Sequence, residues 1–186
     1  MKNIFILLLI IALASTIMIS KDTGGKNLPD NIKIENNNLV LNGAGVIKKF
    51  FFKIYAIGLY LPEKSNDPKK ILKADKAMSL KMHFIRNDID VAKILEGWDE
   101  GFKKSTGNNI SAIKNEINTF KSCFKNNIKE DDTFQYDYIP GTGTRIYINN
   151  QLKATITGMN FKAALFGIWL GEDPRDDGVK DKLLGK

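Results

Sequence analysis

The order of short apolar runs and amphipathic segments along this chain most strongly constrains its fold. Brief β-type runs come first, two segments with helical spacing follow, three further β-type runs come next, and helical segments end the chain. The three later runs (133–139, 144–148 and 152–157) are separated only by Pro140-Gly-Thr-Gly143 and Asn149-Asn150, which predicts an antiparallel meander with tight turns. This grouping predicts an α+β domain with its helices on one face of the sheet.

Local signals place several elements more closely. Asp67-Pro68 predicts the start of a short basic helix that runs to Leu72, and Asp88 is expected to cap the next helix. The aromatic run from Val46 to Leu61 is too long for one average strand, so it predicts a bent strand or a hairpin. Two stripes step by three and four and are interpreted as core packing: Val91, Leu95, Trp98 and Phe102, then Ile110, Ile113, Ile117, Phe120 and Phe124.

The amino-terminal segment has the pattern of an export signal. Residues Ile4 to Ser20 are uncharged and follow a basic start, and Ala12-Leu13-Ala14 offers small residues for cleavage. We expect residues 1–20 to be a signal peptide that is removed, with an uncleaved anchor as the alternative, because the run is at the short end of a membrane span. Residues 21–30 are predicted to be a polar linker and residues 31–186 a single domain. The protein is therefore expected to be periplasmic or secreted, and to contact a membrane only through an uncleaved amino terminus.

Charge argues against a nucleic-acid partner. The chain has 28 basic and 21 acidic residues, which gives a formal net charge of +7. The excess is lysine, spread along solvated faces without a block, and the arginines are only Arg86, Arg145 and Arg175. Weak attraction to an anionic membrane surface or to acidic ligands is compatible with this charge.

The residues that usually build a catalytic or metal centre are scarce. Cys123 is the single cysteine, so no internal disulfide can form. His83 is the single histidine, so no Cys/His or Ser/His/Asp arrangement can be built around a second imidazole. Cys123 lies in a helical pattern and is interpreted as a buried, inert thiol. His83 shares the parity of polar neighbours, which predicts the polar face of a strand. We expect no metal site and no cofactor.

Three stretches together resemble a known family. They are Leu41-Asn-Gly-Ala-Gly45, Tyr55-Ala-Ile-Gly-Leu-Tyr-Leu-Pro62 and Asn160-Phe-Lys-Ala-Ala-Leu-Phe-Gly-Ile-Trp-Leu-Gly-Glu-Asp-Pro174. In this order and at these distances they resemble the chalcone isomerase-like family, in its bacterial exported branch. The resemblance covers Leu39 to Gly185 and implies an open-faced sandwich, a large antiparallel sheet covered on one face by helices.

The same resemblance implies a cleft between sheet and helices, but with altered chemistry. In plant enzymes of the family an arginine just after the Gly-x-Gly-Val motif orients the substrate, and non-enzymatic members use that position to hold a fatty-acid carboxylate. The matching residue here is Ile47, and Tyr55 replaces a threonine of the plant enzymes. Isoleucine neither donates a hydrogen bond nor carries charge, so it cannot stabilise an enolate or clamp a carboxylate. Both departures count against chalcone cyclisation.

Four residues are the candidate ligand-binding set: Lys49, Tyr55, Tyr60 and Arg86. Lys49, or its neighbour Lys48, would replace the arginine as a point charge, and a solvated lysine on a strand edge is the alternative. The two tyrosines either line the cleft or find a local acceptor. Arg86 shares the parity of apolar residues, so it needs an anionic partner, which is an internal aspartate (Asp88 or Asp90) or a ligand.

Three functions remain open at this point. The first is a non-catalytic module that binds a small amphipathic or carboxylate ligand, such as a fatty acid, in the cleft. The second is an isomerase, an intramolecular lyase of the chalcone isomerase type. The third is a structural or interaction domain of the cell envelope with a filled core. We favour the first, because no residue matches the family arginine and because fold and chemistry separate readily.

Overall fold

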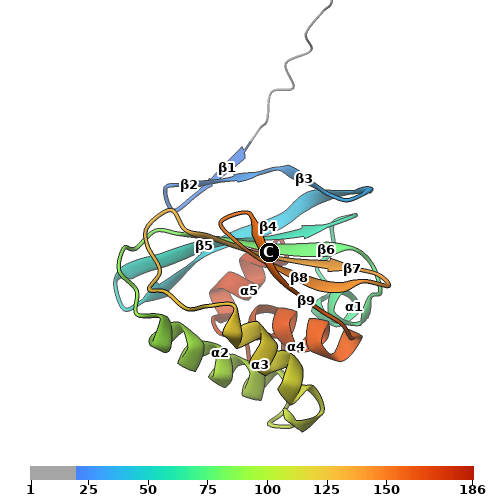
Figure 1. Ribbon diagram of the computed structural model, residues 1–186. Helices are drawn as coiled ribbons and strands as arrows, with labels where there is room; N and C mark the ends of the chain where they lie inside the picture. Colours follow the sequence, from blue (N-terminus) through green and yellow to red (C-terminus); the bar gives the residue numbers. More distant parts are fainter. Residues whose placement is uncertain (1–19) are drawn as a thin grey trace, which may run out of the picture.

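The computed structural model describes residues 20–186, so the predicted signal peptide and its cleavage region lie outside the described residues except for Ser20. Its centre is a seven-stranded sheet in which each strand pairs antiparallel with its neighbours in sequence, from β3 to β9 (Figure 1). The strands are β3 Asn31–Ile34, β4 Asn37–Lys49, β5 Phe52–Leu61, β6 Met78–Phe84, β7 Thr133–Ile139, β8 Gly143–Ile148 and β9 Gln151–Ile156. The predicted meander is confirmed, because β7, β8 and β9 follow one another through two tight turns.

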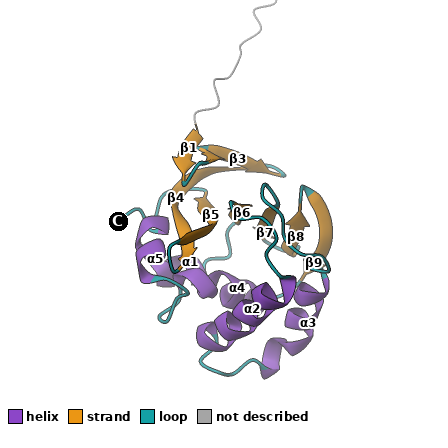
Figure 2. Ribbon diagram, turned by 90° about the vertical axis from the view of Figure 1, so that its left-hand side faces the viewer, coloured by secondary structure: helices purple, strands orange, loops and turns teal. Residues whose placement is uncertain are grey.

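The helices lie together on one face of this sheet. Figure 1 shows them below the strands, and Figure 2 shows the same layer along one side of the curved sheet. The helices are α1 Pro68–Lys73, α2 Val91–Ser105, α3 Lys114–Ser122, α4 Met159–Leu170 and α5 Asp177–Leu183, with a 3₁₀ turn at Ser111–Ile113. The predicted α+β open-faced sandwich is therefore confirmed.

One predicted helix cap is confirmed and another is wrong. The Asp67 side chain accepts a hydrogen bond of 3.0 Å from the Lys70 N–H, at the start of α1. Helix α2 is capped by Asp90, which accepts from the Ala92 N–H at 2.9 Å, and not by Asp88. Asp88 has a positive φ of 51°, whereas a capping residue needs extended backbone, so Asp88 instead forms the turn before the helix.

The aromatic run 46–61 forms a hairpin, one of its two predicted forms. Strands β4 and β5 are joined by the two residues Phe50 and Phe51, with Lys49 opposite Phe52. Strand β4 is longer than its partner, and the register shifts near Gly43 and again after Ile47. These irregularities bend the long strand, which wraps along the edge of the helix layer.

The structure replaces the predicted linker at residues 21–30 with a packed hairpin. Strands β1 Ser20–Thr23 and β2 Lys26–Pro29 pair antiparallel through a turn at Gly24 and Gly25, both of which have positive φ. Leu28 is buried in a second apolar cluster on the sheet face opposite the helices. Burial of this leucine thus contributes to the packing of a segment that looks polar in the sequence.

Charged groups hold this hairpin to the far side of the sheet. The Lys26 ammonium lies 2.5 Å from a carboxylate oxygen of Asp131 and 3.2 Å from Glu130. Asp131 also lies 3.0 Å from His83 Nε2, and His83 is on the polar side of β6 as predicted. The bond from Lys26, and then that from His83, holds the pKa of Asp131 below its usual value.

Aromatic side chains fill the space between the sheet and the helices. Trp98 of α2 contacts Phe120 and Phe124 at ring-centroid distances of 4.9 and 4.3 Å, and Phe84 of β6 contacts Phe134 of β7 at 4.7 Å. Both predicted stripes enter this core, although Val91, Leu95 and Ile110 are only partly buried. The middle of the sandwich is therefore occupied by protein side chains.

A buried lysine from another helix caps the carboxyl end of α1. The side chain of Lys162 in α4 is fully buried, and its ammonium donates to the carbonyls of Ile71, Leu72 and Ala74 at 3.1, 3.0 and 2.8 Å. These carbonyls belong to the last turn of α1 and the residue after it, where carbonyls lack the usual donor four residues on; that of Ile71 also accepts from the Ala74 N–H at 3.3 Å. Lys162 thereby links α4 to α1.

Burial lowers the pKa of Lys162 from 10.5 to about 8, partly opposed by the charge of Asp75. The unfolded chain therefore retains this proton at pH values where the folded protein has released it. We expect the free energy of unfolding to rise from pH 8 toward about pH 10, and to rise more in the wild type than in Lys162→Met. Urea unfolding at stepped pH measures both slopes. Equal slopes would show that Lys162 does not titrate in this range.

Candidate functional site

A groove of about 740 Å³ lies at the end of the sheet, between the β4–β5 hairpin and helix α2. Figure 1 shows how the end of this hairpin extends beside α2. The walls of the groove are the hairpin, the connection 86–90 that follows β6, helix α2, and the residues 175–176 that precede α5. Apolar side chains from the first three walls line it: Ile47, Phe50, Phe52, Ile54, Ile89 and Ile94. The hollow thus lies at the end of the sandwich, beyond its filled middle.

Ile47 forms part of the inner wall of this groove. It is 3% exposed and pairs with Tyr55 across the hairpin. The position at which the family resemblance implies an arginine therefore does line a groove in this chain. Its side chain contributes apolar surface, and any cationic contact with a ligand has to come from other segments.

Arg175 is one such cation, and sequence reasoning missed it. Its guanidinium Nη1 donates to the carbonyl of Gly97 at 3.5 Å, across the groove on α2. A Cβ at position 97 would lie only 2.7 Å from Nη1, so the glycine allows the arginine to lie against the helix. The sequence offered one signal, a glycine within an amphipathic helix.

Arg86 is the second cation that can contact a ligand in the groove. Its Cζ lies 4.4 Å from the centre of the Phe52 ring, a cation–π contact, and the side chain is exposed in the groove. No carboxylate within residues 20–186 forms an ion pair with it, so the predicted alternative of internal pairing with Asp88 or Asp90 is wrong. Asp90 instead holds the first turn of α2.

Other charges in the groove divide into paired and unpaired groups. Lys104 lies 3.7 Å from Glu100 and 3.2 Å from Asp173, and Asp176 accepts the Val179 N–H at the start of α5. The cations that line the groove and form no ion pair within the described part of the chain are Lys48, Lys49, Arg86, Lys93 and Arg175. The predicted residues Lys49 and Arg86 are therefore brought together here.

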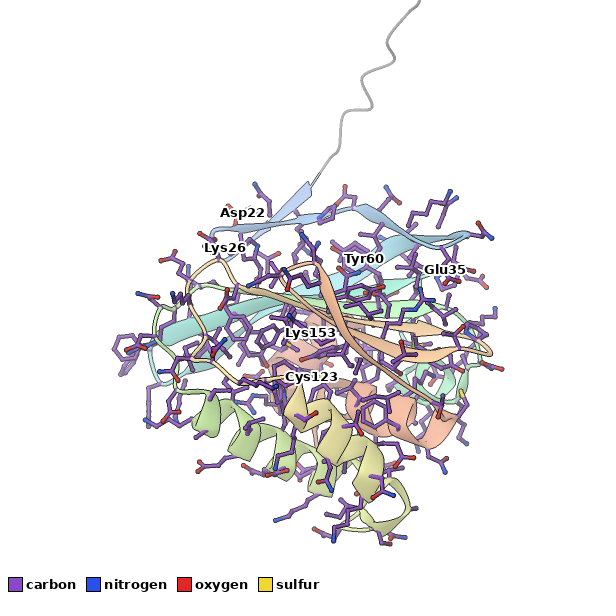
Figure 3. All side chains as sticks on the ribbon, viewed as in Figure 1. Asp22, Lys26, Glu35, Tyr60, Cys123 and Lys153 are labelled. Carbon is purple, nitrogen blue, oxygen red and sulfur yellow. The ribbon has the colours of Figure 1, made fainter. Side chains whose placement is uncertain are left out.

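The two predicted tyrosines do not line the groove. Tyr55 is buried below it, accepts a hydrogen bond of 3.1 Å from Trp169 Nε1, and has a pKa raised by burial. Tyr60 lies on the opposite face of the sheet, in the cluster around Leu28, and Figure 3 shows it away from the helix layer. Residues five apart in a strand point to opposite faces, so the two could not have shared one cleft.

Cys123 lies outside the groove, near the carboxyl end of α3 and close to the sheet edge that carries Lys153 (Figure 3). It is half-buried, and its Sγ donates to the carbonyl of Thr119 at 3.4 Å. Burial raises the pKa of its thiol, which disfavours the reactive thiolate. Within residues 20–186 there is also no group of three or more His, Cys, Asp or Glu side chains arranged to hold a metal ion.

Comparison with known proteins agrees with this architecture. The model of a family described as chalcone isomerase-like matches residues 20–185. The chain belongs to the chalcone isomerase-like family. The match begins upstream of the predicted domain boundary at residue 31, as expected from the packed β1–β2 hairpin.

A solved structure of similar shape is the crystal structure of a fatty-acid binding protein of Arabidopsis thaliana. The two superpose with a TM-score of 0.69 and 16% sequence identity, over 86% of this chain and 92% of that one. Identity at this level shows the common fold alone. No curated protein matches the sequence. The chalcone isomerase-like fold predicted from the three sequence stretches is confirmed.

Proposed function

We propose that this protein binds a small amphipathic carboxylate, such as a fatty acid, in the groove beside α2 and does not transform it. The observation that carries this proposal is a pair of guanidinium groups, Arg86 and Arg175, that have no ion-pair partner in the described chain and line a groove with apolar side chains among its charged ones. Both side chains are exposed, so a ligand can reach them, and the planar fork of a guanidinium matches a carboxylate.

The lining supports a ligand with an apolar tail. Isoleucine side chains form the inner walls with Phe50 and Phe52 at the exposed rim, and the volume of about 740 Å³ falls within the usual range for small-molecule sites. Lys49 adds a point charge at the mouth. A carboxylate near the cations with its acyl chain along Ile47 and Ile54 would satisfy both kinds of surface.

Ile47 supports a binding role over an isomerase role. A ring closure of the chalcone type needs a donor for the developing enolate, and isoleucine provides none. The similar protein from Arabidopsis is named for fatty-acid binding, which agrees with this choice. We also propose that the protein acts after export, because residues Ile4 to Ser20 have the composition of a signal.

Titration of the delipidated protein with a fluorescent fatty acid tests the proposal. We expect a one-to-one complex in the wild type. Arg86→Gln and Arg175→Gln should each weaken binding about 3- to 10-fold, the loss of one charge-assisted hydrogen bond at a partly solvated site. Arg145→Gln is the matched control, since this third arginine pairs with Glu35 at 2.6 Å outside the groove. Its affinity should equal that of the wild type.

Replacing the carboxylate of the ligand gives a second control. A fatty alcohol of equal chain length should bind the wild type more weakly than the acid, and should not distinguish the wild type from the arginine variants. Failure to bind any acyl carboxylate would overturn the proposal. Loss of 2′-hydroxychalcone absorbance faster than in protein-free buffer would instead establish an isomerase.

A further inference from the structure

The tip of the β4–β5 hairpin exposes three consecutive phenylalanines. Phe50, Phe51 and Phe52 are 85%, 97% and 58% exposed, and within residues 20–186 the only other exposed large apolar side chain is Leu152 of β9, at 52%. Single exposed apolar residues are common, but a contiguous apolar patch on a soluble surface usually marks an interaction site.

Turn geometry does not account for these residues. Phe50 has a φ of 55°, in the left-handed region that bulky side chains avoid. The β8–β9 hairpin places Asn149 and Asn150 in that region, and the β1–β2 hairpin uses Gly24 and Gly25. The β3–β4 turn places Glu35 in that region as well, with a φ of 50°, but glutamate has a polar side chain suited to an exposed turn. A bulky apolar residue at the exposed position 50 is therefore not explained by turn geometry, which points to a role outside folding.

Lysines flank the phenylalanines on both sides. Lys48 and Lys49 precede them, Lys53 follows, and all three are exposed. The Lys53 ammonium contacts the Gly24 carbonyl at 3.4 Å, and none of the three lysines forms an ion pair within the described chain. The nearby carboxylates Asp88 and Asp90 belong to another wall of the groove. Lysines beside exposed aromatic rings are the combination that binds anionic lipid surfaces.

We propose that this tip, residues 48–53, docks on an anionic lipid surface. Phe50 and Phe51 enter the boundary between headgroups and acyl chains, and Lys48, Lys49 and Lys53 face the anionic headgroups. A convex two-residue turn suits a fluid surface that reshapes around it, whereas a rigid protein partner would need a matching pocket. This adds a contact to the predicted one through the amino terminus, and it does not depend on what the groove binds.

Docking also has a consequence that rests on the proposed function. Lys48, Lys49, Phe50 and Phe52 line the groove as well as forming the tip. A docked tip therefore brings the mouth of the groove to the level of the headgroups, where an acyl ligand can pass between the bilayer and the protein. Phe51 and Lys53 belong to the tip but not to the lining, so they separate the two activities.

A local probe tests the docking in the full chain. In a Cys123→Ser background, an environment-sensitive fluorophore is attached at Phe51→Cys or, as the matched control, at Leu152→Cys. Both proteins have the same amino-terminal segment, so any contact made by that segment affects them equally. With vesicles that contain phosphatidylglycerol, we expect the emission to shift to the blue at position 51 and not at position 152. Phosphatidylcholine vesicles should give little shift.

Charge variants sharpen this test. In the protein labelled at position 51, Lys48→Gln together with Lys53→Gln should raise the lipid concentration for half-maximal shift roughly 25-fold, about fivefold for each lysine near the surface. Lys53→Gln alone should leave fatty-acid affinity unchanged. Equal shifts at both positions, or no shift at position 51, would overturn the docking proposal. A concentration-dependent shift without vesicles would replace it with self-association. Failure of fatty-acid binding with an intact shift at position 51 would overturn only the groove function.

Discussion

Gly43→Ala is expected to lower the free energy of unfolding by at least about 3 kcal/mol, the upper range for overpacking in a core. A Cβ at this position would lie 2.0 Å from the carbonyl oxygen of Lys182 and 2.8 Å from that of Leu183. Both are backbone atoms at the carboxyl end of α5, so no side-chain rotation can relieve the clash. Helix α5 would have to leave β4. Urea denaturation, or the yield of folded protein, measures the effect.

Gly45→Ala is the matched control on the same strand. Its Cβ would meet the Val179 side chain at 3.2 Å and the next atoms at 3.4 Å or more. A valine side chain can move by a few tenths of an ångström, so we expect a loss of about 1 kcal/mol or less. Equal losses in the two variants would show that close approach of the α5 backbone does not require Gly43.

Asn42→Ala is expected to cost about 2 to 4 kcal/mol. The buried amide donates to the carbonyls of Ser65 and Leu183 at 2.9 and 2.7 Å and accepts from the Ser65 N–H at 2.7 Å. Alanine removes all three bonds at once and leaves their backbone partners unsatisfied. The side chain joins the β4 irregularity to two segments distant in sequence, so its loss should loosen both. Thermal or urea unfolding gives the magnitude.

An exposed asparagine of the same strand provides the comparison. Asn38→Ala should change the free energy of unfolding by less than about 0.5 kcal/mol, because its side chain is exposed. Asn42→Asp adds a sharper test, since it preserves the shape and the acceptor but turns the donor into a carboxylate oxygen facing two carbonyls. That variant should be at least as unstable as Asn42→Ala. A stable Asn42→Asp protein would contradict the assignment of the amide donor.

Gly43 and Asn42 affect the groove as well as the stability of the fold. Arg175 lies just before α5, and its backbone N–H donates to the Ile168 carbonyl at 2.8 Å. The packing of α5 against β4 therefore positions the residues just before α5, which carry the Arg175 guanidinium into the groove. A folded variant with a loosened α5 should resemble Arg175→Gln in its fatty-acid affinity.

Much of the fold could be predicted because its signals are local. The turns at Pro140-Gly-Thr-Gly143 and Asn149-Asn150 are too short for anything but antiparallel neighbours, and the helical stripes repeat within one segment. The β1–β2 hairpin was missed because Leu28 is isolated in a polar stretch, and its burial depends on a cluster built by distant strands. The cap at Asp90 was misplaced because only the backbone conformation distinguishes it from Asp88.

The candidate site was predicted only in part. Lys49 and Arg86 could be proposed from strand parity, and both line the groove. Arg175 could not, because nothing near it in sequence indicates that it lies against Gly97. Tyr55 and Tyr60 have the chemistry of cleft residues, but neither lines the groove. The hydroxyl of Tyr55 accepts a hydrogen bond from Trp169, and Tyr60 lies on the sheet face opposite the helices.

The amino-acid sequence by itself determined the kind and order of the elements, their family and the loss of a donor at Ile47. These properties follow from periodicity, turn residues and the identity of single side chains, each of which acts over a few residues. Tertiary structure alone decided that the interior is filled, that the hollow lies at the end of the sheet, and that Arg86 and Arg175, which form no ion pair within residues 20–186, line the same groove. Those features depend on side-chain volumes and on contacts between segments distant in sequence, such as Arg175 with Gly97 or the α5 backbone with Gly43, which no local pattern encodes.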